Sequence, residues 1–135
     1  MAIYVHKRFD RSFKKTKLFD ADLCNAAAEV KRGEFEADLG GGVIKKRIAL
    51  KAGKRGGARS VIFFKRGNTL FFYDGWSKGE LNKKNAKEIE DDALTAHKIL
   101  AKGYLQASEI DLLQLKNRGT FREVNCDEND VSDIE

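Results

Sequence analysis

Cationic side chains are concentrated in residues 40–64, which read GGGVIKKRIALKAGKRGGARSVIFF. The wider stretch 39–73 holds nine Lys or Arg residues and no Asp or Glu. On an extended strand, Lys45 and Arg47 project from one face about 6.6 Å apart, close to the separation of neighbouring phosphates. Arginine offers two parallel N–H donors to phosphate oxygens, and lysine adds a mobile point charge. The stretch therefore predicts a phosphodiester-binding site.

The glycine-containing loop KAGKRGGA, residues 51–58, extends this site. Its glycines let a ligand approach the backbone closely, and antiparallel pairing of the flanking strands brings Arg59 back towards Arg47. We therefore assign Lys45, Arg47 and Arg59 to the reacting phosphate. Further contacts to RNA are predicted for Lys46, Lys51, Lys54 and Arg55.

The chemistry open to this stretch is restricted, because residues 39–73 contain neither Glu nor His. A lysine acts as a base there only if nearby cations and partial desolvation lower its pKa, while arginines stabilise charge on the phosphorus. A Walker A motif is absent, since Gly53 and Lys54 precede Arg55 rather than Ser or Thr. We expect no metal ion and no other cofactor.

Two aromatic residues are expected near the end of the strand at residues 69–76. Unstacked RNA bases stack on flat aromatic side chains of this kind. Tyr73 and Trp76 are the two candidates, and the neighbouring phenylalanines are assigned to the core. The two histidines, His6 and His97, are expected to be surface residues or satisfied structural residues rather than catalysts.

The bulk composition favours one compact domain of 135 residues with a net charge of +5. Its central positive charge attracts polyanions. The longest apolar run, residues 1–5, is much shorter than a transmembrane helix or a secretory signal, so we expect a cytoplasmic protein without a membrane association. Cys24 and Cys126 match no zinc or redox spacing, which favours two free thiols.

The predicted elements are a strand and two helices, then three strands, then two helices and an edge strand. A strand at residues 3–5 precedes a short helix around Phe9 and Phe13, and Asp20 is placed as the cap of a helix that ends before Gly33. Strands follow at residues 43–50, 59–64 and 69–76. A helix is expected to begin at Asn85, with Ala93, Ala96 and Leu100 on its apolar face, then one capped by Ser108, and an edge strand at residues 120–124.

This order predicts an α+β fold: a small antiparallel β-sheet with N-terminal and C-terminal helices packed on it. Helices are expected to cover one sheet face and leave the other open. We predict a single domain over residues 1–124, followed by an acidic tail, residues 125–135. The tail is expected to be solvated, and a self-shielding or partner-binding role is the alternative.

Three segments together resemble a known family: residues 20–49, from DADLCNAAAEV to KKRIA, then GKRGGARSVIFF, then YDGWSKGELN. They are similar to the RelE-like toxins of type II toxin–antitoxin modules, and within these to the HigB-like branch with a GKxGGxR loop. The resemblance spans residues 20–124. It implies a RelE-like fold, binding in the ribosomal A site, metal-independent cleavage of mRNA by the 2′-hydroxyl, and neutralisation by a cognate antitoxin.

The resemblance also implies catalytic positions. It supports Lys45, Arg47 and Arg59 and adds Lys78, which follows the third central strand. Two positions differ from the family pattern, because Gly79 replaces an arginine and Asn85 replaces a tyrosine.

Three functions stay open at this point. The first is a ribosome-dependent endoribonuclease that inhibits translation, and the second is a non-catalytic binder of RNA or the ribosome. The third is a ParE-like toxin directed at a protein such as DNA gyrase. The cationic residues favour the first two, and we expect the chain alone to be a monomer with an antitoxin, the ribosome and mRNA as partners.

Overall fold

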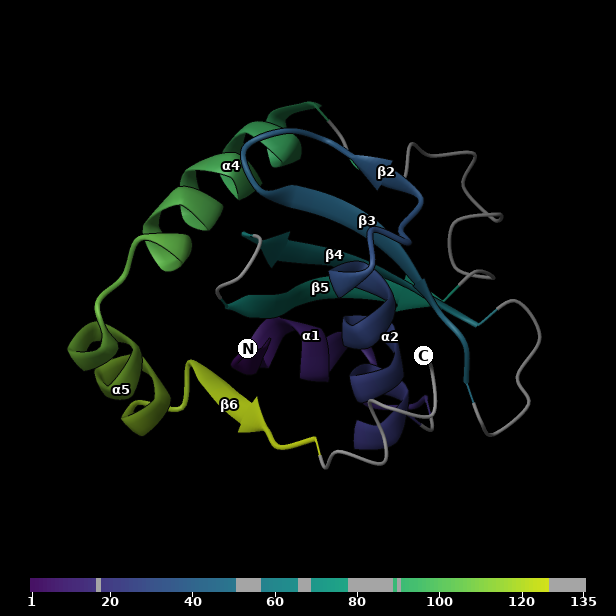
Figure 1. Cartoon of the computed structure of the whole chain (residues 1–135), viewed down its shortest axis with the longest axis horizontal. Coiled ribbons are helices and arrows are strands. Elements are labelled where there is room, and N and C mark those ends of the chain that lie inside the picture. Colours follow the sequence, from purple (N-terminus) through teal and green to yellow (C-terminus); the bar gives the residue numbers. More distant parts are fainter. Residues whose placement is uncertain (17, 51–56, 66–68, 78–88, 90, 127–135) are drawn as a thin grey trace.

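The computed structural model describes residues 1–16, 18–50, 57–65, 69–77, 89 and 91–126. Its first half contains β1 (Ile3–His6), α1 (Lys7–Ser12), α2 (Asp20–Lys31), β2 (Ala37–Asp38) and β3 (Val43–Ile48). Its second half contains β4 (Ala58–Phe64), β5 (Leu70–Ser77), α4 (Asp91–Leu105), α5 (Glu109–Asn117) and β6 (Phe121–Val124) (Figure 1). The predicted α+β class is confirmed.

One sheet of six strands contains all of these strands in the order β2-β3-β4-β5-β1-β6. Its central hairpins are antiparallel, as expected, but β1 pairs with β5 in parallel. The sheet is therefore mixed rather than antiparallel throughout. The parallel pair is possible because the chain leaves β1 through two helices, which provide the long connection that parallel strands require.

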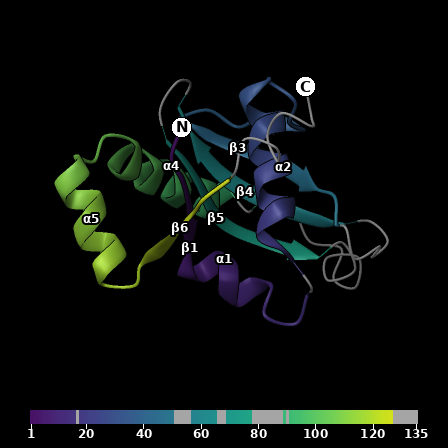
Figure 2. The ribbon, with the colours of Figure 1, turned by 60° about the horizontal axis from the view of Figure 1, so that its bottom comes forward.

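Helices cover both faces of the sheet, so the expectation of one open face is wrong. Figure 2 shows α2 on one side and α4 with α5 on the other. Val5, Phe9 and Ile62 belong to the core under α1 and α2, whereas Val61 and Phe63 belong to the core under α4. The central strands are apolar on both faces, and burying both faces requires two helical layers.

The helix α4 packs through a different stripe from the predicted one. His97 and Ala101 are buried, whereas Ala96 and Leu100 are exposed. The predicted start at Asn85 lies outside the described residues. The prediction followed the apolar stripe of Ala93, Ala96 and Leu100, whereas α4 turns the neighbouring stripe with the polar His97 towards the sheet.

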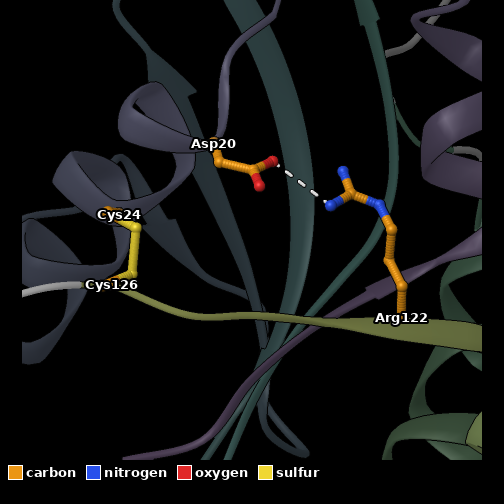
Figure 3. The surroundings of a disulfide bond; sticks show 4 residues. All are labelled: Asp20, Cys24, Arg122 and Cys126. Carbon is orange, nitrogen blue, oxygen red and sulfur yellow. Dashed lines mark hydrogen bonds and ion pairs between the residues drawn. A yellow bond between two sulfur atoms is a disulfide. The ribbon is translucent and has the colours of Figure 1, made fainter.

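Cys24 on α2 and Cys126, two residues after β6, form a disulfide bond (Figure 3). The expectation of two free thiols is therefore wrong. Cys24 and Cys126 are 102 positions apart in sequence, yet their Cα atoms are 5.8 Å apart. The pairing of β6 with β1 produces this proximity, because β6 then ends beside α2. Such a long-range approach leaves no signal in the cysteine spacing.

Several local predictions hold at the chain's ends. Ser108 caps α5, accepting a hydrogen bond from the backbone N–H of Asp111, and β6 is an edge strand. Asp20 is not the cap of α2 but its first residue. It accepts a hydrogen bond from Arg122 of β6 at 3.2 Å. Within the described residues, no helix combines the length and apolar character needed to cross a membrane.

Candidate nucleic-acid interface

The register of β3, β4 and β5 places three predicted side chains in one row across the sheet. Arg47 lies opposite Arg59, and Arg59 lies opposite Trp76. Residues directly opposite each other on neighbouring strands have Cβ atoms about 5 Å apart. Two guanidinium groups and an indole ring are therefore brought to one face from three separate strands.

Lys45 is on the same face, one row towards the centre of the sheet, because it lies two residues before Arg47. It is opposite Val61, whose side chain belongs to the core under α4. Lys45 and Arg59 are half-buried, and Arg47 is exposed. The strand alternation predicted from sequence is therefore confirmed for this face. We use the name cationic row for the three cations on this face, Lys45, Arg47 and Arg59, together with Trp76 beside them.

Lys46 points to the opposite face and does not belong to the cationic row. Its side chain is buried under α2, with its ammonium 3.6 Å from the Glu29 carboxylate. An ammonium in this position is not accessible to a polyanion. The predicted RNA contact of Lys46 is therefore not supported, because strand alternation puts this residue on the apolar side of β3, where an ion pair with α2 accommodates its charge.

Tyr73 is also unsuited to the role predicted for it. Its ring is 5% exposed and stacks on Phe63 at 4.6 Å beneath α4. Tyr73 belongs to the same core as Phe71, two residues earlier on β5, so strand alternation directs it beneath α4. A β-bulge between Val61 and Ile62 then shifts the strand pairing. Trp76, beyond the bulge, is half-buried and is the aromatic residue left near the arginines.

A polar cluster adjoins the buried tyrosine, and sequence reasoning did not predict it. The Arg8 guanidinium lies 5.4 Å from the centre of the Tyr73 ring and donates to the Asp74 carboxylate at 3.0 Å. The other Asp74 oxygen accepts from the Ser12 hydroxyl at 2.9 Å. These residues come from α1 and β5, so only the packing of α1 beside the strand brings them together.

Both histidines lie in this cluster. His6 and His97 contact Tyr73 with ring centres 4.9 and 5.2 Å away. Burial lowers the pKa of each imidazole, and the nearby Arg8 charge lowers both further. Of the two expected alternatives, surface or structural, the structural one agrees with this packing, since both are buried between β-strands and α4.

Glu36 is a second residue that sequence reasoning missed. Its carboxylate accepts a hydrogen bond from the Arg47 backbone N–H, and its own N–H donates to the Lys45 carbonyl oxygen at 3.0 Å. A carboxylate therefore lies at the strand edge beside two of the predicted cations. Glu36 immediately precedes β2, a strand of two residues that is too short to produce an alternating pattern.

The remaining predicted residues, Lys51, Lys54, Arg55 and Lys78, lie outside the described residues. In the part of the chain that the structure describes, no three His, Cys, Asp or Glu side chains gather to form a metal site. The described part of the interface offers donors for phosphate oxygens, one partly exposed aromatic ring and a carboxylate acceptor. This arrangement suits binding of a phosphodiester beside an unstacked base.

Comparison with known proteins gives one family match. The model of a family described as RelE toxin of the RelE / RelB toxin–antitoxin system matches residues 1–124. No curated protein and no solved structure matches the chain.

Proposed function

This chain belongs to the RelE toxin family of toxin–antitoxin systems, and from that premise we propose that it is a ribosome-dependent endoribonuclease. It would cleave mRNA in the ribosomal A site, stop translation and arrest growth. The family implies an antitoxin as partner. The HigB-like branch, the cytoplasmic location and the monomeric state of the free toxin are parts of the same proposal.

The observation that carries the proposal is the cationic row. Arg47 and Arg59 are paired across β3 and β4, and Lys45 lies on the same face. Two guanidinium groups at this spacing can hold the non-bridging oxygens of one phosphodiester. Glu36 lies against the β3 backbone beside this row, through the Arg47 N–H and the Lys45 carbonyl oxygen.

The proposed reaction needs no metal ion. The ribose 2′-oxygen attacks the adjacent phosphorus, the bond from phosphorus to the 5′-oxygen breaks, and a 2′,3′-cyclic phosphate and a 5′-hydroxyl result. A lysine of the set Lys45 and Lys78 accepts the 2′-hydroxyl proton, and the departing 5′-oxygen takes a proton from water. Arg47 and Arg59 stabilise the added negative charge in the transition state. Trp76 is proposed to stack on a base.

Arg59 provides the direct test. We expect Arg59→Ala to remove toxicity while the protein stays folded, because losing one charge-assisted donor to the transition state costs about a hundredfold in rate, roughly 3 kcal/mol. The measurement is primer extension on a reporter mRNA after induction, which maps new 5′ ends. Arg118→Ala, an exposed arginine at the end of α5, is the matched control and should cleave normally. Full cleavage by folded Arg59→Ala would overturn the assignment.

A non-catalytic block of the ribosome is the second candidate, because the cationic row would bind RNA in either case. The same experiment separates the two: growth arrest without new mRNA ends favours occupancy rather than cleavage. A ParE-like protein target is less favoured, since the cationic row would then have no phosphate to bind.

A further inference from the structure

A groove of about 870 Å³ lies beside the start of β3, at the opposite end of this strand from Arg47. Its floor is apolar and comes from α2, β3, β4 and α4: Val30, Ile44, Phe64 and Leu105. Four lysines line it: Lys31, Lys65, Lys98 and Lys102. The lining acid is Asp38, whose carboxylate already accepts the Gly40 N–H at 2.9 Å. The groove therefore combines an apolar floor with excess positive charge.

The glycine turn before β3, residues 40–42, lines part of this groove. Gly42 has a φ of +84°, and a Cβ there would lie 2.6 Å from a methyl carbon of Leu105. A Cβ at Gly41 would lie 3.2 Å from the Lys98 side chain. Because the glycines leave this space free, α4 packs directly on the turn, and the Lys98 stem is held along it. Lys98 is thus positioned by packing, and the other three lysines line the groove beside it.

We propose that this groove binds the acidic segment of the same chain, residues 127–135. The segment reads DENDVSDIE, with five acids, no cation and two apolar residues, Val131 and Ile134. Five carboxylates complement the four lysines, and the two aliphatic side chains match the apolar floor. The segment itself lies outside the described residues, and the match rests on its sequence and on the groove.

The point where the segment begins also favours this occupant. Cys126 is bonded to Cys24 on α2. A second depression, lined by Cys24, Ala27, Lys31 and Cys126, follows α2 from the disulfide, and Lys31 lines the groove as well. Cys24 and Lys31 are seven positions apart on α2, about 10 Å along the axis. Nine extended residues span up to about 30 Å, so the segment is long enough to reach and cross the groove.

Occupation of the groove neutralises positive charge at one end of the sheet. Polyanions are then attracted mainly to the cationic row at the other end, because local potentials follow the local charge. This inference does not depend on the proposed nuclease activity, since it concerns only the fit of one segment of the chain to its own surface.

The test uses the full chain and a fluorescein-labelled peptide of sequence DENDVSDIE, with binding followed by fluorescence anisotropy. In a tail-neutral variant the five acids are replaced by their amides: Asp127→Asn, Glu128→Gln, Asp130→Asn, Asp133→Asn and Glu135→Gln. The peptide should bind this variant at least tenfold more tightly than the wild-type chain, whose own segment competes. Equal affinity for the two chains would overturn the proposal.

Charge reversal locates the peptide. In the tail-neutral variant, Lys98→Glu with Lys102→Glu should weaken binding at least tenfold, and the milder Lys98→Gln with Lys102→Gln should weaken it in the same direction. The control, Lys14→Glu with Lys15→Glu, changes two exposed lysines outside the groove and should alter affinity less than twofold. Equal losses in both reversals would show nonspecific attraction and contradict the groove. So would unchanged binding of a peptide carrying Val131→Ser and Ile134→Ser.

Other occupants give distinct results. Carbodiimide cross-linking of the wild-type chain should join tail carboxylates to groove lysines within one chain, and cross-linked dimers as the main product would assign the groove to a second copy. A nine-nucleotide oligouridylate that binds through Lys98 and Lys102, with no binding of the peptide, would assign it to nucleic acid. Either outcome overturns the proposal.

Discussion

Gly75 fixes how closely β5 approaches its neighbours next to the cationic row. A Cβ at this position would lie 2.4 Å from the Phe13 ring and 2.7 Å from the carbonyl oxygen of Arg59. The ring and the backbone are both held by packing, so neither can move away cheaply. The absence of a side chain at Gly75 therefore helps to keep Arg59 beside Trp76.

We predict that Gly75→Ala lowers the free energy of unfolding by about 1–3 kcal/mol, as overpacking of a core usually does. Urea denaturation gives this value. Gly103→Ala is the matched control, because a Cβ there meets nothing within 4 Å in the interior of α4, and alanine should stabilise this helix by about 0.5–1 kcal/mol. A Gly75→Ala protein as stable as wild type would contradict the packing described here.

Residue types and strand alternation were sufficient to predict the core of the interface. Lys45, Arg47 and Arg59 share a face because alternation along β3 and β4 is a local property that sequence displays. Tyr73 was misplaced because α4 covers the sheet face on which it lies, whereas one face was expected to stay open. Glu36 and Asp74 were missed because their roles arise only when other elements pack against them.

At the scale of elements, the contact of α4 with the sheet includes a polar side chain, His97. His97 of α4 packs on Tyr73, and the charges of Arg8 on α1 and Asp74 on β5 act on it. His6 on β1 packs on the same tyrosine and contacts Tyr104 of α4. Both imidazoles are buried and are disfavoured as cations. The attachment of α4 to the sheet therefore depends on two neutral histidines.

This arrangement predicts that stability falls as pH drops from 7.5 to 5.5. The pKa values of His6 and His97 are lowered in the folded state. Below the unfolded value of about 6.5, the unfolded chain therefore binds more protons than the folded one, and lowering the pH favours unfolding. The stabilisation is complete above that pH and decreases below it, towards the folded pKa values.

Urea midpoints measured across this range test the prediction, because most carboxylates stay ionised there. His97→Gln should show a smaller decrease than the wild-type protein, since one of the two titrating groups is gone. An equal decrease in both proteins, or a midpoint that does not move with pH, would argue against the role of His97.

The fold's elements were predicted with uneven success, and the reason is the range of the contacts involved. Strands β3, β4 and β5 follow from their own apolar patterns, and Ser108 marks the start of α5 by local capping. The parallel pairing of β1, the second helical layer and the Cys24–Cys126 bond depend on contacts between distant segments. Neither spacing nor periodicity along the chain encodes such contacts.

The disulfide is an element-scale constraint, because it fastens the end of β6 to α2 (Figure 3). In the chain-entropy model, closing a loop of about 100 residues stabilises a protein by roughly 4–5 kcal/mol. We therefore expect dithiothreitol to lower the urea midpoint of the wild-type protein. A Cys24→Ser, Cys126→Ser variant should start at the lower midpoint and should not respond to the reductant.

An unchanged midpoint in reduced wild-type protein would contradict this expectation. The result also bears on the proposed cytoplasmic location, because disulfides are rare in reducing compartments. Arg122 of β6 adds ion pairs with Asp10 on α1 and Asp20 on α2, at 2.9 and 3.2 Å. These exposed pairs contribute little on their own, so the covalent bond should dominate.

At the scale of the whole molecule, charge is segregated although the net charge is only +5. The central stretch holds nine cations and no acid over residues 39–73, while the rest of the chain is net negative. In the fold, the cations of this stretch lie at two places. Three of them form the cationic row near one end of β3, and Lys65 lines the groove beside the other end. A polyanion such as rRNA or mRNA would be attracted most strongly to the cationic row, which holds three cations of this stretch.

This segregation predicts a steep dependence of ribosome affinity on salt. Each phosphate neutralised on a single strand contributes about −0.7 to the slope of log affinity against log salt. Three contacts from Lys45, Arg47 and Arg59 therefore imply a loss on the order of tenfold or more between 50 and 200 mM salt. Arg59→Ala should reduce the slope by roughly 0.7, and Arg118→Ala should leave it unchanged. A flat response would mean that phosphates do not carry the binding, which would favour a protein target instead.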